Sequence, residues 1–439
     1  MHIAKLFVYD EFNPQDVAMM QALYSRSAES VETHAEKVKS SGSGKFMETY
    51  YVNYGHASIA DCGSTTLFIE GVSMLAAKAI QDWPLYSGQE TSTRYIDMSK
   101  QAILDPVGTR ASDAILKRWM EFYISSQNRV SDHLRRLYPR KEDEKEPVYD
   151  KAIKARTFDV LRSFLPAGVT TQLSWHTNLR QGADKLALLR HHPLPEIRSL
   201  AHDMHARLLE RYPNSFSHKR YEETEAYYED AGRVYMYYRP SHGVSHRVVC
   251  STMIGPEQLK RYEDLITRRP PKTNLPHFLS ELGPLTFEFL LDFGSFRDLQ
   301  RHRNGVCRMP LITGEYGFHP WYLEQLPEDL RRQAERLIQE QLKDILELDA
   351  SPETKQYYFA MGFAVPCKVS YGLPATVYVV ELRSGKTVHP TMRRIAHGMA
   401  ARLKERFPNL VLHADLDADD WDIRRGLQDI TKKHSEQTA

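Results

Sequence analysis

Three consecutive residues, Arg301, His302 and Arg303, gather positive charge at the end of a mostly apolar segment, GSFRDLQRHRNGV at 294–306. An arginine guanidinium presents a planar fork of N–H donors, and this geometry suits phosphate oxygens. Cations are also favoured at the C-terminus of a helix, because the helix dipole places partial negative charge there. The segment alone therefore predicts either an anion-binding site or an ordinary helix end.

A second polar group lies in the first half of the chain, within WPLYSGQETSTRYIDMS at 83–99. Ser87, Glu90, Ser92 and Arg94 fall within eight positions, and the small residues between them indicate a flexible loop. Two hydroxyls and a guanidinium at this spacing can hold a phosphate. The same residue types also form a capping box at the start of a helix, so this alternative stays open.

The composition excludes several classes of protein. The 58 Lys and Arg residues balance 57 Asp and Glu residues, so a protein that coats nucleic acid or an anionic membrane is not expected. The four cysteines are far apart, and the histidine pairs at 191–192 and 202–205 lack a carboxylate or cysteine at metal-ligand spacing, so no disulfide framework and no metal site is expected. No apolar run reaches the roughly 20 residues that span a bilayer. We expect a soluble, cytoplasmic protein with reduced thiols.

The chain contains an internal repeat. Residues 195–214, PEIRSLAHDMHARLLERYPN, align without a gap to residues 390–409, PTMRRIAHGMAARLKERFPN, with a majority of identical positions. Each copy predicts an amphipathic helix that stops at a proline. Upstream, 64–83 and 283–302 both begin as β-rich runs and then change to a helical period.

This repetition predicts an α/β fold of two related halves, 1–225 and 226–439, each a sheet with packed helices. The join is expected near 215–250, where the sequence loses clear periodicity. The charged stretch 135–151 has no good counterpart in the second half and is expected to be a solvated insertion.

The two polar groups occupy matching places in the two halves, and together they complete one pattern. It reads RHR, two residues, Ser, one residue, Asn-Glu, one residue, Ser, one residue, Arg-Tyr, and it resembles the signature of the flavin-dependent thymidylate synthases. The first half carries the back of this pattern as Ser87, Gln89, Glu90, Ser92, Arg94 and Tyr95, with Asp82-Trp83-Pro84 in place of RHR. The second half carries the front as Arg301, His302 and Arg303, and its back has become Val306, Arg308, Met309, Leu311 and Thr313.

Two further segments are similar to this family. NYGHASIADCGSTTLF at 53–68 is similar to a segment with a histidine near the flavin, which implies that His56 and Ser58 are flavin neighbours. Residues 161–201 follow the family's C-terminal region, and Arg180 stands where the family places an arginine on the nucleotide. The resemblance thus covers most of both halves.

The resemblance implies one composite site per chain, because family members assemble as four subunits with active sites between subunits. The first half would keep the nucleotide side and the second half the flavin side, so that two tandem chains mimic the tetramer. The expected substrate-binding residues are Ser87, Glu90, Ser92, Arg94, Arg180 and Arg301, with Ser92 and Arg94 also taken as catalytic. The expected cofactor-binding residues are His56, Ser58, Arg301, His302 and Arg303.

The implied reaction is reductive methylation of deoxyuridylate (dUMP) at C5. FAD would deliver the hydride, methylenetetrahydrofolate the carbon, and NADPH would reduce the flavin, with no metal and no cysteine nucleophile. Two alternatives stay open: a flavoenzyme that makes another C5 modification of a pyrimidine nucleotide, and a non-catalytic homologue that binds flavin or nucleotide.

Overall fold

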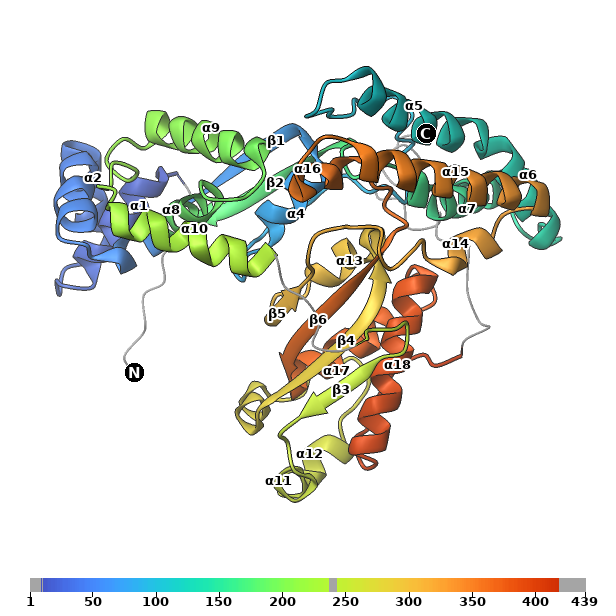
Figure 1. Cartoon of the computed structure of the whole chain (residues 1–439). Helices are drawn as coiled ribbons and strands as arrows, with labels where there is room; N and C mark the ends of the chain where they lie inside the picture. Colours follow the sequence, from blue (N-terminus) through green and yellow to red (C-terminus); the bar gives the residue numbers. More distant parts are fainter. Residues whose placement is uncertain (1–8, 10, 237–242, 418–439) are drawn as a thin grey trace. The chain divides into compact units, whose positions relative to one another are not determined.

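The structure is a computed structural model that describes residue 9, residues 11–236 and residues 243–417. Its contacts divide the chain into two units. Unit 1 comprises Met1–Glu70, Ala76–Glu90 and Gln172–Tyr235, and unit 2 comprises Gly71–Leu75, Thr91–Thr171 and Met236–Ala439. The described residues form helices and two sheets that are joined by loops, so the expected α/β class is confirmed (Figure 1).

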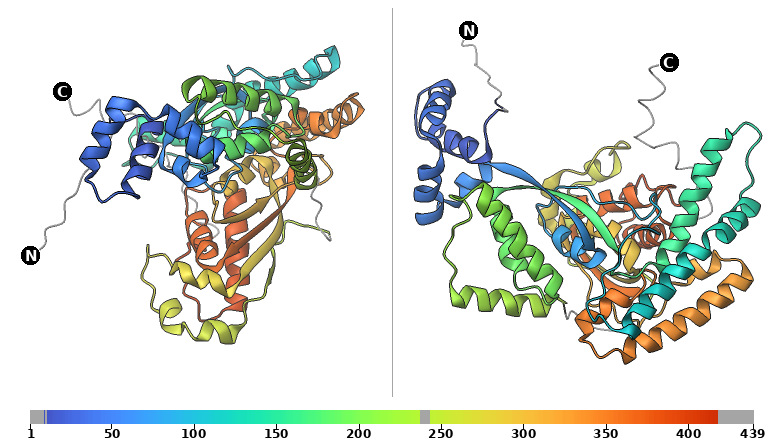
Figure 2. Two further views of the ribbon diagram at one scale, coloured as in Figure 1. Left: turned by 90° about the vertical axis from the view of Figure 1, so that its left-hand side faces the viewer. Right: turned by 90° about the horizontal axis from the view of Figure 1, so that it is seen from above.

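Unit 1 is built mainly from helices beside a two-stranded sheet of β1 and β2. Its elements are α1 (Pro14–Tyr24), α2 (Val31–Ser41), α3 (Gly44–Phe46), η1 (Met47–Asn53), η2 (Ala57–Cys62), most of β1 (Ser64–Ser73), α4 (Met74–Gln81) and β2 (Thr170–Asn178), then α8 (Leu179–Leu189), α9 (Pro195–Arg211) and α10 (Glu222–Met236). Isolated bridges from Ser87 to His176 and from Glu90 to Leu173 place the 87–90 segment along β2. Figures 1 and 2 show α8, α9 and α10 grouped beside the β1–β2 ribbon.

Unit 2 combines a four-stranded antiparallel sheet with a group of longer helices. Its first elements are α5 (Arg110–Ser125), α6 (Gln127–Leu137), α7 (Glu146–Leu161), η3 (Arg162–Phe164), β3 (Val249–Thr252), α11 (Pro256–Lys260), α12 (Glu263–Thr267), η4 (His277–Leu282), β4 (Pro284–Asp292) and α13 (Phe293–Gln300). They are followed by β5 (Gly305–Arg308), α14 (Pro320–Glu324), α15 (Glu328–Glu347), α16 (Pro352–Lys355), η5 (Gln356–Tyr358), β6 (Ala364–Gly372), α17 (Leu373–Arg383) and α18 (Pro390–Arg406).

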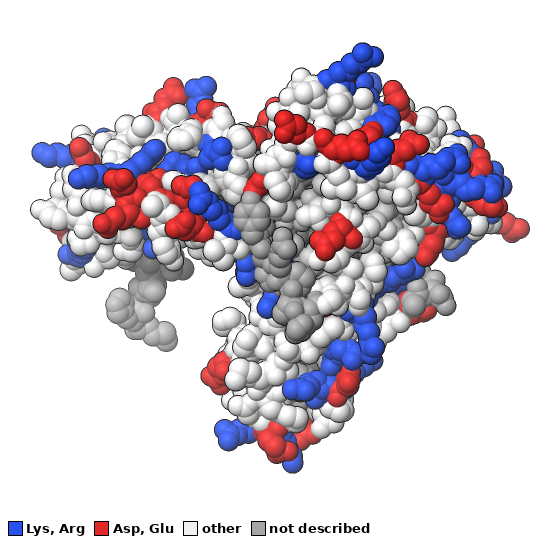
Figure 3. Space-filling model, viewed as in Figure 1, with Lys and Arg blue, Asp and Glu red and all other residues white. Residues whose placement is uncertain are grey.

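The core of unit 2 lies between its sheet and the helices α13, α17 and α18. The strand order is β3-β4-β6-β5, and β4 pairs with β6 from Pro284↔Gly372 to Asp292↔Ala364. Alternate residues of β4 point inward, as the period of a strand requires, and Leu285, Phe287 and Phe289 are fully buried. Charged side chains of both signs cover the outer faces of the longer helices (Figure 3), which fits the nearly balanced composition.

The two segments that carry the sequence repeat contain the same elements in the same order. Adding 194 to the bounds of η3, β2 and α8 gives the bounds of η5, β6 and α17, and adding 195 to those of α9 gives those of α18. The predicted switch from strand to helix occurs in both copies, as β1 with α4 and as β4 with α13. These agreements support the proposal of a duplicated chain, although the two units are not the two halves.

Four backbone hydrogen bonds in unit 2 connect the repeated segments reciprocally. They run from Ala167 N to Phe359 O (2.8 Å), from Met361 N to Leu165 O (2.8 Å), from Gly168 N to Tyr357 O (2.9 Å) and from Gly362 N to Ser163 O (2.8 Å). Donor and acceptor change places between positions 194 apart, since 361 − 167 and 359 − 165 are both 194. This reciprocity is that of an interface between identical subunits related by a two-fold axis.

Two regions differ from or refine the expectations. The join, expected to lack regular structure, contains the helix α10. The stretch 135–151 crosses the end of α6 and the start of α7, and its residues are mostly exposed, with an ion pair between Arg135 and Asp150 at 2.8 Å.

Candidate functional site

Arg94 lies in unit 2 and is held by a buried carboxylate. Its Nε donates to Asp159 Oδ1 at 2.8 Å and its Nη2 donates to Oδ2 at 3.3 Å and to the Thr387 carbonyl at 3.2 Å. Asp159, on α7, is fully buried, and its burial raises the pKa of the carboxyl, an effect that the guanidiniums of Arg94, Arg162 and Arg156 oppose. Within the described residues, Nη1 of Arg94 makes no hydrogen bond, so it is the donor that stays available to a ligand.

Arg94 and Arg301 are more than 200 positions apart, and the charges of both lower the pKa of the same side chain. That side chain is Asp298 on α13, two residues before the helix ends. Burial by itself would raise the pKa of Asp298, but the guanidiniums of Arg162, Arg94, Arg383 and Arg301 together hold it well below its usual range. We call these four arginines, with Asp298 and Asp159, the arginine cluster.

The Arg301–Arg303 motif follows the last turn of α13. Arg301 is the C-cap residue and is exposed, and its side chain makes no hydrogen bond or ion pair within the described residues. The carbonyl that a helix-end cation would satisfy is instead bonded by Arg383 of α17, whose Nη2 donates to Asp298 O at 2.6 Å. Because Arg383 has this role, Arg301 is left free to meet an anion.

His302 has a different setting from its two neighbours. Its ring is buried, and Nε2 accepts a hydrogen bond from Arg383 Nε at 2.7 Å. Burial, assisted by the charge of Arg383, lowers the pKa of His302 to about 3. At neutral pH the ring is therefore uncharged, and the positive charge of the motif comes from Arg301 and Arg303.

The phosphate loop predicted at 87–95 divides between the two units. Ser87 and Glu90 belong to unit 1, where His176 N donates to the Ser87 carbonyl at 2.7 Å and Gln81 Nε2 donates to Glu90 Oε2 at 2.7 Å. Ser92 belongs to unit 2, and its Oγ accepts from Arg94 N at 3.3 Å. No helix begins here, so Ser92 closes a turn instead of the capping box considered above.

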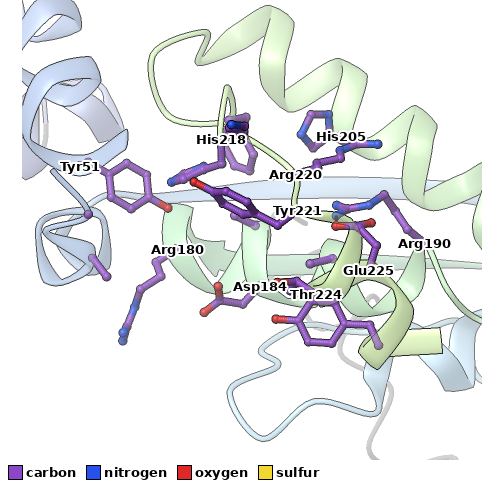
Figure 4. Close-up of a pocket in the computed structure, with 17 residues that line it drawn as sticks. Tyr51, Arg180, Asp184, Arg190, His205, His218, Arg220, Tyr221, Thr224 and Glu225 are labelled. Atoms are coloured by element: carbon purple, nitrogen blue, oxygen red, sulfur yellow. Dashed lines mark hydrogen bonds and ion pairs between the residues drawn. The ribbon is translucent and has the colours of Figure 1, made fainter. Parts of the chain in front are cut away.

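Unit 1 contains a cavity of about 510 Å³ that is lined by both cations and aromatic rings (Figure 4). Arg180, Arg190, Lys219 and Arg220 outnumber Asp184 and Glu225 on its wall. The rings are Tyr51, Phe216, Tyr221 and Tyr228, accompanied by His205 and His218. We call it the unit 1 pocket. Aromatic faces with a net positive charge suit a ligand that carries a planar ring and a phosphate or carboxylate.

Arg180 lines this pocket and forms an ion pair with Asp61. Its guanidinium meets Asp61 of η2 through Nε at 2.7 Å and through Nη2 at 2.7 Å, and about a third of each side chain is exposed. His56 and Ser58 are exposed, and the residues that flank His56, Gly55 and Ala57, line the pocket. The structure therefore brings Arg180 and the 55–58 segment to one cavity, although neither His56 nor Ser58 lines it.

Asp82-Trp83-Pro84, which replaces RHR in the first half, is committed to internal bonds. Asp82 Oδ2 accepts from Tyr235 OH at 2.5 Å, and its carbonyl accepts from Lys185 Nζ at 2.8 Å. Trp83 Nε1 donates to Gln181 at 3.0 Å. These contacts make this segment part of the packing between α4, α8 and α10.

Sequence reasoning missed the acids that hold the arginines. Asp159 and Arg162 stand inside the run TFDVLRSFLPAG, where a charge among apolar residues is a signal of a paired, buried group. Asp298 lies three residues before Arg301, within GSFRDLQRH, and the mostly apolar character of this segment gives no signal of its role. Arg383 and Arg190 carry no local signal, because single arginines near helix ends are common.

Two side-chain donors lie next to each other at the end of α13, on Gln300 and Arg301. Gln300, which precedes Arg301 and is 5% exposed, has a buried Nε2 with no hydrogen-bond partner among the described residues. This amide and the exposed Arg301 guanidinium are donors without acceptors, so they fit a dinucleotide phosphate. Among the described residues no group of His, Cys, Asp or Glu could hold a metal ion, and all four cysteines are free.

In residues 9, 11–236 and 243–417, none of the helices combines the length and the apolar character that crossing a membrane requires.

Comparisons with known proteins give one family and several relatives. Residues 5–214 match the family described as thymidylate synthase complementing protein, which confirms the resemblance drawn from the first half. A UPF0159 protein of Chlamydia pneumoniae is 24% identical over 447 residues, covering 88% of this chain and 83% of the relative. A UPF0159 protein of Thermoplasma acidophilum is 24% identical over 460 residues, covering 88% and 91%. These relatives match both halves, so they share the double length.

Proposed function

We propose, because residues 5–214 match the thymidylate synthase complementing family, that this protein is an FAD-dependent thymidylate synthase-like enzyme that methylates dUMP at C5. One observation carries this proposal: Arg94 of the first half-motif and Arg301 of the second lie in the same unit and act on the same carboxylate, Asp298. Two incomplete motifs thus contribute to a single arginine cluster, as a composite site requires.

In this proposal the cluster binds and orients anions. Arg301 and the Gln300 amide hold the cofactor's phosphates together with Arg303, and Arg94 offers Nη1 to the phosphate of the nucleotide. When bound, the flavin supplies the hydride chemistry, with methylenetetrahydrofolate and NADPH as co-substrates. Ser92 belongs to the same unit and adds a hydroxyl to the nucleotide side, whereas Ser87, Glu90 and Arg180 keep their proposed nucleotide role, and His56 and Ser58 their proposed flavin role, within unit 1.

His302 acts in this proposal as a neutral, fixed group and not as a cation. Its bond from Arg383 orients the ring, and Arg383 also anchors the last turn of α13 through the Asp298 carbonyl. Asp159 holds the Arg94 guanidinium and Asp298 pairs with Arg162 before any ligand arrives, so Arg94 needs little reorganisation on binding. We also propose that each chain has one such site and that two chains pair to mimic the family's tetramer.

The purified protein tests the proposal directly. It should show flavin absorbance as isolated or after incubation with excess FAD, and it should convert dUMP to thymidylate when methylenetetrahydrofolate and NADPH are supplied. Calorimetry should give far tighter binding for dUMP than for deoxyuridine, which lacks the phosphate. A protein without flavin bands after incubation, or with equal affinity for nucleotide and nucleoside, would contradict the proposal.

A second candidate, a non-catalytic homologue that binds flavin or nucleotide, is favoured by the engagement of Arg94. Two of its three nitrogens are bonded to Asp159 and Thr387, which leaves one for a ligand. Flavin and dUMP binding without product formation would identify this candidate. A flavoenzyme with a different C5 modification would consume dUMP and form a product other than thymidylate.

A further inference from the structure

Helix α10 places an acidic side chain on the cations of the unit 1 pocket. Glu225 Oε1 accepts from Arg190 Nη2 at 2.7 Å, and Oε2 lies 2.7 Å from His191 Nε2. The Arg190 side chain is 9% exposed and its Nε, also buried, has no hydrogen-bond partner among the described residues. The carboxylate of Glu225 is therefore already bound to Arg190, the least exposed cation on the wall of this pocket (Figure 4).

The surroundings of Glu225 strengthen the attraction for an anion. Burial lowers the pKa of His205, and the nearby charges of Arg220 and Arg190 lower it further, which shows that three basic groups converge here. Arg220 is exposed, and it makes no hydrogen bond or ion pair within the described residues. The positive charges of Arg190 and Arg220 together exceed the single negative charge of Glu225, so a phosphate with two negative charges could bind there.

Residues 222–235 of α10 attach to the rest of unit 1 mainly through polar groups. Its inward face is formed by Glu225, Tyr228, Gly232 and Tyr235, at the three- and four-residue spacing of one helix face, and none of residues 222–235 is buried. Tyr228 stacks obliquely on His191 with ring centroids 6.4 Å apart, and Tyr235 donates to Asp82 at 2.5 Å. At Gly232 a Cβ would approach the His191 carbonyl to 3.4 Å, so glycine permits this close approach.

Within residues 222–235, helix α10 is therefore held mainly by charges and hydroxyls, and none of the aliphatic side chains in this range is buried. A helix normally gains its stability from an apolar stripe packed on a core. The remaining acids of α10, Glu222, Glu223, Glu229 and Asp230, are exposed, and the last two pair with Arg233 of the same helix. Such a helix is easily released once the contact at Arg190 is broken, because little hydrophobic area is lost.

We propose that α10 is an autoinhibitory strap, whose Glu225 occupies the anion position of the unit 1 pocket and is displaced by a phosphate-bearing ligand. The strap follows from the contacts above and is separate from the proposed function, which places the phosphate of dUMP on Arg94 of unit 2. Opening of the strap frees Arg190 and His191 for the ligand phosphate and opens the pocket wall formed by Tyr221, Thr224 and Tyr228.

The test compares Glu225→Gln with Glu223→Gln, which removes the same charge from an exposed position of the same helix. Hydrogen exchange of residues 222–235 without ligand should rise in Glu225→Gln and stay unchanged in Glu223→Gln. Inorganic pyrophosphate, measured by calorimetry at fixed ionic strength, should bind Glu225→Gln about tenfold more tightly than wild type, the change expected if the strap is closed about nine-tenths of the time. Adding pyrophosphate to wild type should raise the exchange of 222–235.

Unchanged exchange in Glu225→Gln, equal or weaker binding of pyrophosphate to that variant, or protection of 222–235 by pyrophosphate would each overturn the strap. The last outcome would make α10 a fixed wall of the pocket. A parallel titration with dUMP separates this result from the proposed function. If pyrophosphate shows the difference between the variants and dUMP does not bind, the strap stands and the proposed substrate fails.

Discussion

Replacing Arg94 with alanine tests how much of this side chain's role is structural. The substitution removes two charge-assisted hydrogen bonds from Asp159, whose carboxylate is fully buried. At about 1.5–3 kcal/mol for each such bond, the loss is roughly 3–6 kcal/mol, which matches the roughly 3–5 kcal/mol typical of a broken buried ion pair. Because the charges of Arg162 and Arg156 still act on Asp159, we expect a value near the lower end, about 3 kcal/mol.

The assay is urea unfolding of wild type, Arg94→Ala and the double variant Arg94→Ala/Asp159→Asn. The second substitution removes the buried charge and keeps the shape, so it should recover at least half of the lost free energy of unfolding. Binding of dUMP to the double variant then isolates the role of Arg94 toward a ligand, and we expect it to be lost. A loss below about 1 kcal/mol in Arg94→Ala, or no recovery in the double variant, would refute the reasoning.

Three other predictions follow from single features. Arg301→Ala should weaken FAD retention without lowering the melting temperature, since the side chain is exposed and makes no internal bond among the described residues; a matched drop in both would contradict this. Gly362→Ala should destabilise unit 2 by about 1–3 kcal/mol, because its Cβ would meet the Phe318 ring at 2.3 Å, whereas Gly243→Ala, with open space, serves as the control. The free energy of unfolding should fall as the pH drops below about 6.5, because histidines of the unfolded chain bind protons there. In the folded protein the pKa values of His302 and His319 are lowered to about 3 and about 4, so both rings stay neutral and each contributes a slope of about 1.4 kcal/mol per pH unit. A urea midpoint that stays constant between pH 7 and 5 would exclude this prediction.

The helices and strands of the repeat were predictable, because the spacing of their apolar side chains and the positions of their prolines indicate where each element begins and ends. The helices predicted at 195–214 and 390–409 are α9 and α18, each begun by a proline at its first position and stopped near a second one. The change from strand to helix was also visible, since β4 alternates buried and exposed residues before the period lengthens in α13. Patterns of this kind depend only on neighbours in the sequence.

Helix α10 and the acidic partners of the arginines could not be predicted in this way. The inward face of α10 carries Glu225, two tyrosines and a glycine, so it shows no apolar period and reads as an irregular join. Asp159 and Asp298 lie more than 130 positions apart, and their meeting around Arg94 and Arg162 depends on packing across the repeat. Sequence spacing suggested which groups could bind phosphate, but only the fold shows that Arg94 already has a carboxylate.

Duplication explains why the two halves could come to differ at equivalent positions. The first half has Arg190 and His191, which both contact Glu225, and 194 positions later the chain has Ser384 and Gly385, whose side chains carry no charge. After the strand and helix that begin each half, the cation lies instead in the second half, which has Arg301 where the first has the segment around Asp82.

In a homotetramer a substitution at either place would change every site at once. In a tandem chain each half can keep one set of cations, and the position that lost its ligand is free to be bonded internally, as Asp82 is by Tyr235. The proposed strap is consistent with such a division: the unit 1 pocket keeps Arg190, and Glu225 pairs with this cation while the strap is closed.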